Sequence, residues 1–264
     1  MTAGIVAQWS MLALYVLATL TRLPDAIRGV NRSIFIYFLM VSGAIALSLP
    51  TFYLPIDGLF GGQNVTNLML RFLNFGACLV IGRRIAEAYD SPLAEKAIRG
   101  PAGWIAFGVI GGLMTVFFVL SDTLGSAAGL AGLRPQETLV IYSSLGYLFP
   151  AYVAVCLLGP VFSDVTWGDE SGANKAASWL MLAGLAGVAV QPILYTACMA
   201  APSLSLIQLL TAFFSLGLIG IALTVMWLAN RKWFPAHKSE PDGIRPVLRL
   251  VGPIGSPAEE LADS

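Results

Sequence analysis

Seven long apolar runs, separated by short polar segments, constrain this chain more than any other feature of its sequence. A membrane-spanning helix needs about 20 consecutive, mainly apolar residues. The sequence therefore predicts an all-α, polytopic membrane protein, a bundle of seven transmembrane helices. The predicted spans cover approximately residues 4–20, 34–54, 65–82, 103–120, 139–162, 177–200 and 204–229.

The composition agrees with a location in the bilayer. Hydrophobic residues make up 57% of the 264-residue chain and charged residues 11%, against about 45–50% and about 25% in soluble proteins. So few charges would leave much apolar surface of a soluble domain uncovered. The expected localisation is therefore the cell membrane, with the lipid bilayer as a partner. The formal net charge is zero, which gives no indication of nucleic-acid binding.

The distribution of lysine and arginine predicts the orientation of the bundle. Thirteen of the 15 basic residues lie in the tail or in the loops that follow the first, third and fifth spans, and Arg22 is counted among these loop residues. Cytoplasmic loops of membrane proteins are enriched in lysine and arginine. The pattern therefore places the N-terminus outside and the C-terminus in the cytoplasm, as an odd number of spans requires.

The chain divides into two predicted parts. Residues 1–232 form the seven-helix membrane domain, and residues 233–264 form a short cytoplasmic tail that we expect to be disordered. Between the third and fourth spans, residues 83–100 are expected to extend the third span and then to begin a new helix. Ser91 is the predicted N-cap of that helix and Pro92 its first residue.

Small residues and one proline predict how the spans pack and bend. Gly108 with Gly112, and Ala183 with Gly187, are small residues four apart, a spacing that permits close approach of two helices. Pro192 lies within the sixth predicted span. A proline at such a position frees a backbone carbonyl and bends the helix.

Arg71 places a permanent positive charge inside the third predicted span. It lies about six residues from the outer end, or roughly 9 Å at 1.5 Å per residue. Asn67, Arg71 and Asn74 are spaced i, i+4 and i+7, so they share one helix face. Arginine exposed to lipid is costly, and we therefore expect Arg71 to point into the bundle and to pair with an acid near the outer surface. The candidate partners are Asp57, Asp122 and Glu137, and Asp122 is the preferred one because it ends the fourth span at about the right height. Snorkelling to the outer head groups is the structural alternative.

Further polar residues lie at a similar depth in the fifth, sixth and seventh spans. If these faces converge, they form a polar pocket that opens to the outside. Hydrogen bonds between neighbouring helices are the alternative use of the same side chains. The candidate ligand-binding residues are Asn67, Arg71, Asn74, Asp122, Tyr142, Gln191, Tyr195 and Gln208.

The reactive residue types are few and widely spaced. The only histidine is His237, in the tail, and the three cysteines, Cys78, Cys156 and Cys198, lie in separate apolar runs. A structural zinc site and a Ser-His-Asp triad within the membrane are therefore excluded, and no cofactor is expected. The seventh span contains no lysine, which also excludes a retinal protein.

The block from Leu54 to Phe75 reads LPIDGLFGGQNVTNLMLRFLNF. It resembles a block of actinobacterial seven-helix membrane proteins of unknown function, which have an Asp-centred, Gly-containing outer loop followed by an Asn-led third helix. The resemblance covers the membrane region only. It implies a bacterial seven-helix protein and no known activity. The matching positions are Asp57, Gly58, Gly62, Asn64, Asn67 and Leu68.

Three functions remain open. The preferred interpretation is a sensor, receptor-like or interaction protein, which binds a ligand outside and contacts a cytoplasmic protein partner through Arg83, Arg84, Lys96 and Arg99. A small-molecule transporter or channel-like protein is the alternative, although the spans contain no acid or lysine to couple ions. A lipid-acting enzyme comes third, because we interpret the one acidic cluster as a solvated loop. That cluster is Asp164, Asp169 and Glu170.

The orientation makes a direct prediction for reporter fusions. A reporter placed after Lys232 should report the cytoplasm, and one placed within residues 125–132 should report the exterior, because basic loops stay on the cytoplasmic side. A paired phosphatase and fluorescent-protein assay at the two points measures this. The opposite pattern at either point would overturn the orientation.

Overall fold

The computed structural model describes residues 3–130, 132–168 and 172–233, and the regular secondary structure of this part is entirely helical. All but the first residue of the predicted tail, as well as Asp169 and Glu170, lies outside the described residues. The α-helices are α1 (Ala3–Ile27), α2 (Arg32–Ser48), α3 (Pro50–Leu59), α4 (Val65–Ala88), α5 (Pro92–Arg99), α6 (Pro101–Leu120), α7 (Glu137–Trp167), α8 (Ala173–Ala189), α9 (Gln191–Ala200) and α10 (Ser205–Trp233). Two short 3-10 turns are η1 (Ala128–Leu130) and η2 (Pro202–Leu204).

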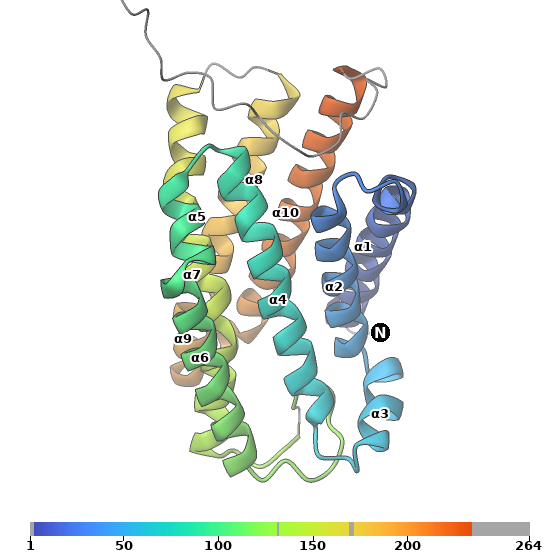
Figure 1. The fold of residues 1–264 in the computed structure, drawn as a ribbon. Coiled ribbons are helices and arrows are strands. Elements are labelled where there is room, and N and C mark those ends of the chain that lie inside the picture. Colours follow the sequence, from blue (N-terminus) through green and yellow to red (C-terminus); the bar gives the residue numbers. More distant parts are fainter. Residues whose placement is uncertain (1–2, 131, 169–171, 234–264) are drawn as a thin grey trace, which may run out of the picture.

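Successive long helices run up and down the bundle (Figure 1). Five helical segments are long and apolar enough to cross a membrane, and there are seven if each of two bent helix pairs counts as one span. The described part of the chain is therefore all-α, with five to seven candidate spans. One end of the bundle contains the turns at residues 28–31 and 89–91 and the last residues of α10. We call it the basic end. The end with the loops at 60–64 and 121–136 is the Asp57 end.

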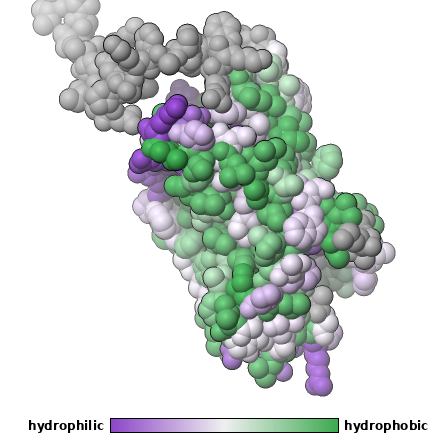
Figure 2. All heavy atoms as spheres, turned by 90° about the vertical axis from the view of Figure 1, so that its right-hand side faces the viewer, coloured by the Kyte–Doolittle hydropathy of each residue, from purple (hydrophilic) through white to green (hydrophobic). Residues whose placement is uncertain are grey.

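The surface has the character expected for contact with lipid. Hydrophobic residues cover most of the face shown in Figure 2, and the most hydrophilic residues gather near its upper end. Large apolar side chains such as Leu17, Val119 and Phe214 are exposed. A soluble monomer rarely exposes apolar surface on this scale, so the arrangement supports a membrane-embedded protein.

Two of the predicted spans are broken rather than continuous. The predicted helix over residues 34–54 ends at Ser48, and α3 starts at Pro50 with a bend of 86°. Proline suits the first turn of a helix because its missing N–H needs no partner there. In the sixth span, α8 and α9 meet at Val190 with a bend of 42°. The predicted bend at Pro192 is therefore confirmed, with the proline in the first turn of α9.

The start of α5 follows the sequence prediction. Ser91 caps the helix, and its Oγ accepts a hydrogen bond from the Ala94 N–H at 3.4 Å. Pro92 is the first helical residue. α4 also continues to Ala88, six residues past the predicted end of the span. The turn at residues 89–91 therefore joins two well-defined helix ends.

Arg22 lies inside α1, so its prediction as a loop residue is wrong. α1 continues to Ile27, and the Arg22 side chain is only 2% exposed. Its guanidinium donates to the carbonyls of Ala18 at 3.1 Å and Leu223 at 3.3 Å. It also lies 4.3 Å from the ring centre of Phe38 and 5.1 Å from that of Trp227. Carbonyl dipoles and aromatic faces thus surround this cation.

Close contact between helices depends on several glycines. The spacing of small residues in the sequence predicted only some of them. A Cβ at Gly187 would overlap the Ser215 side chain, which agrees with the predicted contact at Gly187. A Cβ at Gly184 would lie 2.9 Å from the Ser215 carbonyl oxygen and 2.7 Å from Ile219 Cγ1. The predicted role of Gly108 and Gly112 is wrong, because a Cβ at either position meets nothing within 4 Å.

We predict that Gly184→Leu destabilises the bundle and that Gly108→Leu does not. The larger side chain at residue 184 has to displace α10, and overpacking of this kind costs about 1–3 kcal/mol. Thermal melting of the two purified variants in detergent measures the difference. Equal melting temperatures would show that α8 and α10 are not in close contact.

Candidate functional site

Asp57 organises the Asp57 end of the bundle from a fully buried position, with 0% of the residue exposed. Its Oδ2 accepts hydrogen bonds from the Asn64 N–H at 3.0 Å and from Ser126 Oγ at 2.6 Å. Its Oδ1 accepts from the Thr66 N–H at 3.3 Å. The two N–H donors belong to the start of α4, where the helix dipole favours a negative charge. Asp57 therefore acts as a cap contributed by another helix.

Asn64 connects this cap to the long loop that follows α6. Its backbone is left-handed, with φ of 58°, which asparagine adopts more readily than most residues. Its Oδ1 accepts from Tyr53 Oη at 2.7 Å and from the Ala127 N–H at 2.8 Å. Its Nδ2 donates to the carbonyls of Thr123 at 2.8 Å and Gly125 at 2.9 Å. One side chain thus joins α3, α4 and the loop.

Arg71 lies between α4 and α7, as the polar stripe predicted. Its Nε donates to Asn67 Oδ1 at 3.0 Å, and its Nη1 donates to the Ser143 carbonyl at 3.1 Å. Tyr142 Oη donates to the same Asn67 oxygen at 2.7 Å. The guanidinium carbon lies 4.5 Å from the ring centre of Tyr142 and 5.9 Å from that of Tyr147. Neutral acceptors and aromatic faces therefore hold the cation in place.

Gly146 makes room for the arginine. A Cβ at this position would overlap the Arg71 guanidinium at Nη1. The glycine lies in α7, one residue before Tyr147 and within one turn of Tyr142 and Ser143. The space for the cation is therefore built into the helix that supplies its contacts.

The predicted ion pair between Arg71 and Asp122 does not form. The ion pairs of the described residues involve Arg83, Arg84 and Arg99 only. Asp122 is exposed, and its backbone exchanges two hydrogen bonds of 2.9 Å with the Gln136 side chain. The height of Asp122 along the bundle suggested the pairing, but the loop after α6 directs the residue to solvent.

Tyr147 joins the Arg71 contacts to the remaining candidate residues. Gln208 Nε2 donates to Tyr147 Oη at 3.1 Å, and the ring centres of Tyr147 and Tyr195 are 5.2 Å apart. Gln191 Nε2 donates to the Gln208 carbonyl at 3.5 Å. The structure thus brings six of the predicted residues together in one connected set: Asn67, Arg71, Tyr142, Gln191, Tyr195 and Gln208. Tyr147 and Gly146 also belong to this set, which we call the Arg71 network.

Two atoms of the Arg71 network have no hydrogen-bond partner among the described residues. Arg71 Nη2 donates no hydrogen bond within the described part of the chain. Gln191 Oε1 is buried and accepts none from the residues described. Asn74 lies one turn beyond Arg71 and is half-buried, with no side-chain hydrogen bond in the described part. The network therefore offers one free donor group and one free acceptor.

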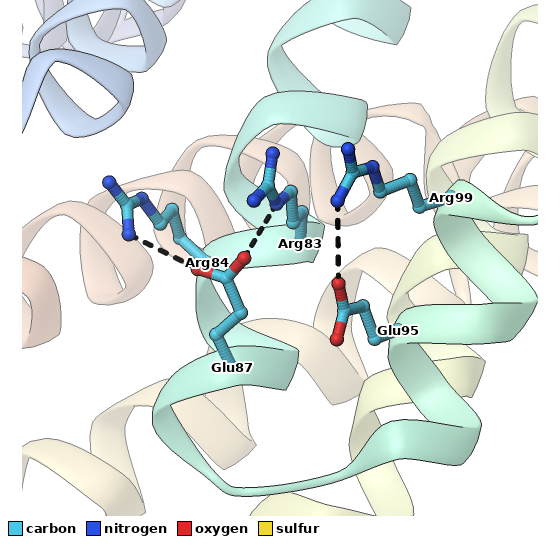
Figure 3. A network of polar contacts seen from close by, with 5 residues as sticks. All are labelled: Arg83, Arg84, Glu87, Glu95 and Arg99. Atoms are coloured by element: carbon cyan, nitrogen blue, oxygen red, sulfur yellow. Dashed lines mark hydrogen bonds and ion pairs between the residues drawn. The ribbon is translucent and has the colours of Figure 1, made fainter. Parts of the chain in front are cut away.

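The basic end carries a second group of predicted residues (Figure 3). Arg83 and Arg84 both contact Glu87, at 2.6 and 3.1 Å, and Arg99 lies 3.7 Å from Glu95. Lys96 is exposed. These pairs are local to α4 and α5 and lie on the surface, so each stabilises the fold only slightly. Four basic side chains against three acidic ones, Glu87, Asp90 and Glu95, leave the end of α4, α5 and the turn between them with a small excess of positive charge.

The acidic cluster is not a simple solvated loop. Asp164 lies within α7 and is half-buried, and its Oδ2 accepts from Ser178 Oγ at 3.0 Å. Asp169 and Glu170 lie outside the described residues. Among the described residues, no group of three or more His, Cys, Asp or Glu side chains is placed to hold a metal ion.

No protein-family model, curated protein or solved structure matches this chain in the three comparisons made. The resemblance to actinobacterial seven-helix proteins therefore stays a prediction.

We predict that Asp57→Asn lowers stability whereas Asp122→Asn does not. An amide at residue 57 turns one acceptor into a donor that faces Asn64, Thr66 and Ser126, and leaving a buried group unpaired costs about 1–3 kcal/mol. Asp122 is a matched control, because it is an exposed acid at the same end. Melting temperatures of both variants measure this, and a similar melting temperature for the two would contradict the capping role.

Proposed function

We propose that this protein is a sensor or receptor-like protein of the cell membrane that binds an anionic ligand at Arg71. In this proposal the seven helical passes place the N-terminus and the Asp57 end outside, and the basic end in the cytoplasm. The distribution of basic residues supports the orientation. The Arg71 network supports the binding site.

The observation that carries the proposal is a permanent cation without a counter-charge inside a candidate span. Arg71 is half-buried between α4 and α7 and has no acidic partner among the described residues. Insertion of an arginine at the centre of a membrane costs about 2.5–3.5 kcal/mol. A carboxylate or phosphate group bound at Nη2 supplies the missing negative charge. The planar guanidinium of arginine suits such groups because its N–H donors match the geometry of their oxygens. Tyr147 and Tyr195, which are partly exposed, give the ligand aromatic faces.

α4 provides the route from the ligand to the cytoplasm. It runs without a break from Val65 to Ala88, so Arg71 and Arg83 lie on one rigid rod, about 18 Å apart at 1.5 Å per residue. A ligand that draws Arg71 towards α7 tilts this rod. The positive surface of Arg83, Arg84, Lys96 and Arg99 then moves relative to the other helices. That surface suits an acidic segment of a cytoplasmic protein partner.

Transport of a small molecule is the second candidate function. The broken pairs α2–α3 and α8–α9 favour it, because transporters place substrate sites at discontinuous helices. Gln191, with its free Oε1, begins α9 at such a break. Uptake of radiolabelled acetate and phosphate by proteoliposomes separates the two functions: a sensor gives binding without flux, and a transporter gives both.

We predict that acetate or inorganic phosphate raises the melting temperature of the wild-type protein and not that of Arg71→Gln. At ten times the dissociation constant, a bound anion stabilises the folded state by about 1.4 kcal/mol. Titration at constant ionic strength, with thermal melting as the readout, measures the effect in nanodiscs.

The matched control is Arg134→Gln, which removes an exposed arginine at the same end of the bundle. It should respond to the anions as the wild type does. Gly146→Ala should lose the response, because its Cβ occupies the place of the Arg71 guanidinium. An Arg71→Gln variant that is stabilised as strongly as the wild type would refute binding at Arg71.

A further inference from the structure

A hollow of about 410 Å³ lies at the basic end, where the turn between α4 and α5 faces the last turns of α7. It is far along α4 from the Arg71 network, so it is a separate feature of the molecule. Most of its lining residues carry a polar group. They are Tyr89, Asp90, Ser91, Pro160, Ser163, Asp164, Trp167 and Gly168.

The hollow has the chemistry of a cation site. Its described lining includes two carboxylates, Asp90 and Asp164, and no basic side chain. Neither carboxylate forms an ion pair within the described part of the chain. Asp164 is held in place because its Oδ2 accepts from Ser178 Oγ, which lies 2.9 Å from Tyr89 Oη. Its Oδ1 accepts no hydrogen bond from the residues described.

Trp167 adds an aromatic face beside these acids. It is the last residue of α7, and 77% of it is exposed although it lines the hollow. A tryptophan ring is the best aromatic partner for a guanidinium or ammonium group. Carboxylates together with an exposed indole therefore suit an arginine side chain with apolar neighbours better than a small metal ion.

The chain itself contains a segment of this kind. Residues 244–251 read IRPVLRLV, with two arginines, five large apolar residues and no acid. Gly243 and Gly252 bound the segment. Its composition differs from that of the more polar sequence on both sides.

The segment can reach the hollow. α10 ends at Trp233, at the basic end (Figure 1). The residues that line the hollow belong to the same end. The 12 residues from Trp233 to Arg245 span up to about 40 Å when extended. A bundle of this kind, with helix axes about 8–10 Å apart, is roughly 30 Å wide. A tethered segment also has a high effective concentration, so weak contacts are sufficient.

We infer that residues 244–251 dock on this hollow, with Arg245 and Arg249 facing Asp90 and Asp164 and the apolar side chains covering Trp167. Charge complementarity and the length of the connecting chain favour this occupant over a separate protein. The docked segment lies beside the start of α5, next to the positive surface proposed for a cytoplasmic partner.

Hydrogen–deuterium exchange on the full chain, in nanodiscs of neutral phosphatidylcholine, tests the inference. When about nine molecules in ten have the segment docked, its amides exchange about tenfold more slowly than free ones. We expect this protection for residues 244–251 and not for residues 254–262. The double variant Asp90→Asn, Asp164→Asn should lose it, as should Arg245→Gln, Arg249→Gln. Asp25→Asn, an acid of α1 at the same end, should keep it.

A charge-reversal experiment distinguishes loss of docking from misfolding of a variant. Arg245→Glu with Arg249→Glu should lose the protection, and adding Asp90→Lys should restore part of it. Two results would overturn the inference. One is free exchange of residues 244–251 in the wild type. The other is protection that survives Asp90→Asn, Asp164→Asn, which would show that the segment is held elsewhere, for example on the lipid surface.

Discussion

The buried carboxylate of Asp57 holds together one whole end of this bundle. A carboxylate without a cation is stable in such a place only if other dipoles neutralise it. Here the start of α4 and the Ser126 hydroxyl do so, and Asn64 extends the same set of bonds into the loop after α6. The cap fixes where α4 begins and therefore the height of Asn67 and Arg71. The position of the candidate site depends on it.

Arg71 and Arg22 show two ways of holding an arginine in an apolar bundle without an acid. Both donate to backbone carbonyls and lie against aromatic rings. The difference is exposure: Arg22 is closed off between α1, α2 and α10, whereas Arg71 is half-buried and keeps Nη2 free. The same chemistry serves as a structural clamp at one position and, in our proposal, as a ligand site at the other. Accessibility separates the two roles.

Some of the helices that connect the two ends of the molecule are continuous, and others are bent at a break. α4 and α7 run unbroken along the bundle, and they carry the Arg71 contacts at one end and the lining of the acidic hollow at the other. The α2–α3 and α8–α9 pairs are bent. A change at Arg71 therefore has two stiff elements through which to reach the basic end.

The sequence by itself determined the all-α, membrane-type fold, the start of α5 at Ser91 and Pro92, and the polar face of Asn67 and Arg71. Each of these depends on hydropathy, capping or helical spacing within a few residues. The count of seven spans and their orientation stay predictions. Only the tertiary structure decided that Arg71 meets Tyr142 and Tyr147 rather than Asp122, that Arg22 is buried, and that Asp57 caps α4. Those outcomes depend on which helices pack together and on where a loop directs its side chains. The Arg71 and Arg22 contacts join residues 72 and 201 positions apart, which leave no local signal in the sequence. Asp57 lies only seven positions from Asn64, but it reaches the start of α4 because of the turn between α3 and α4.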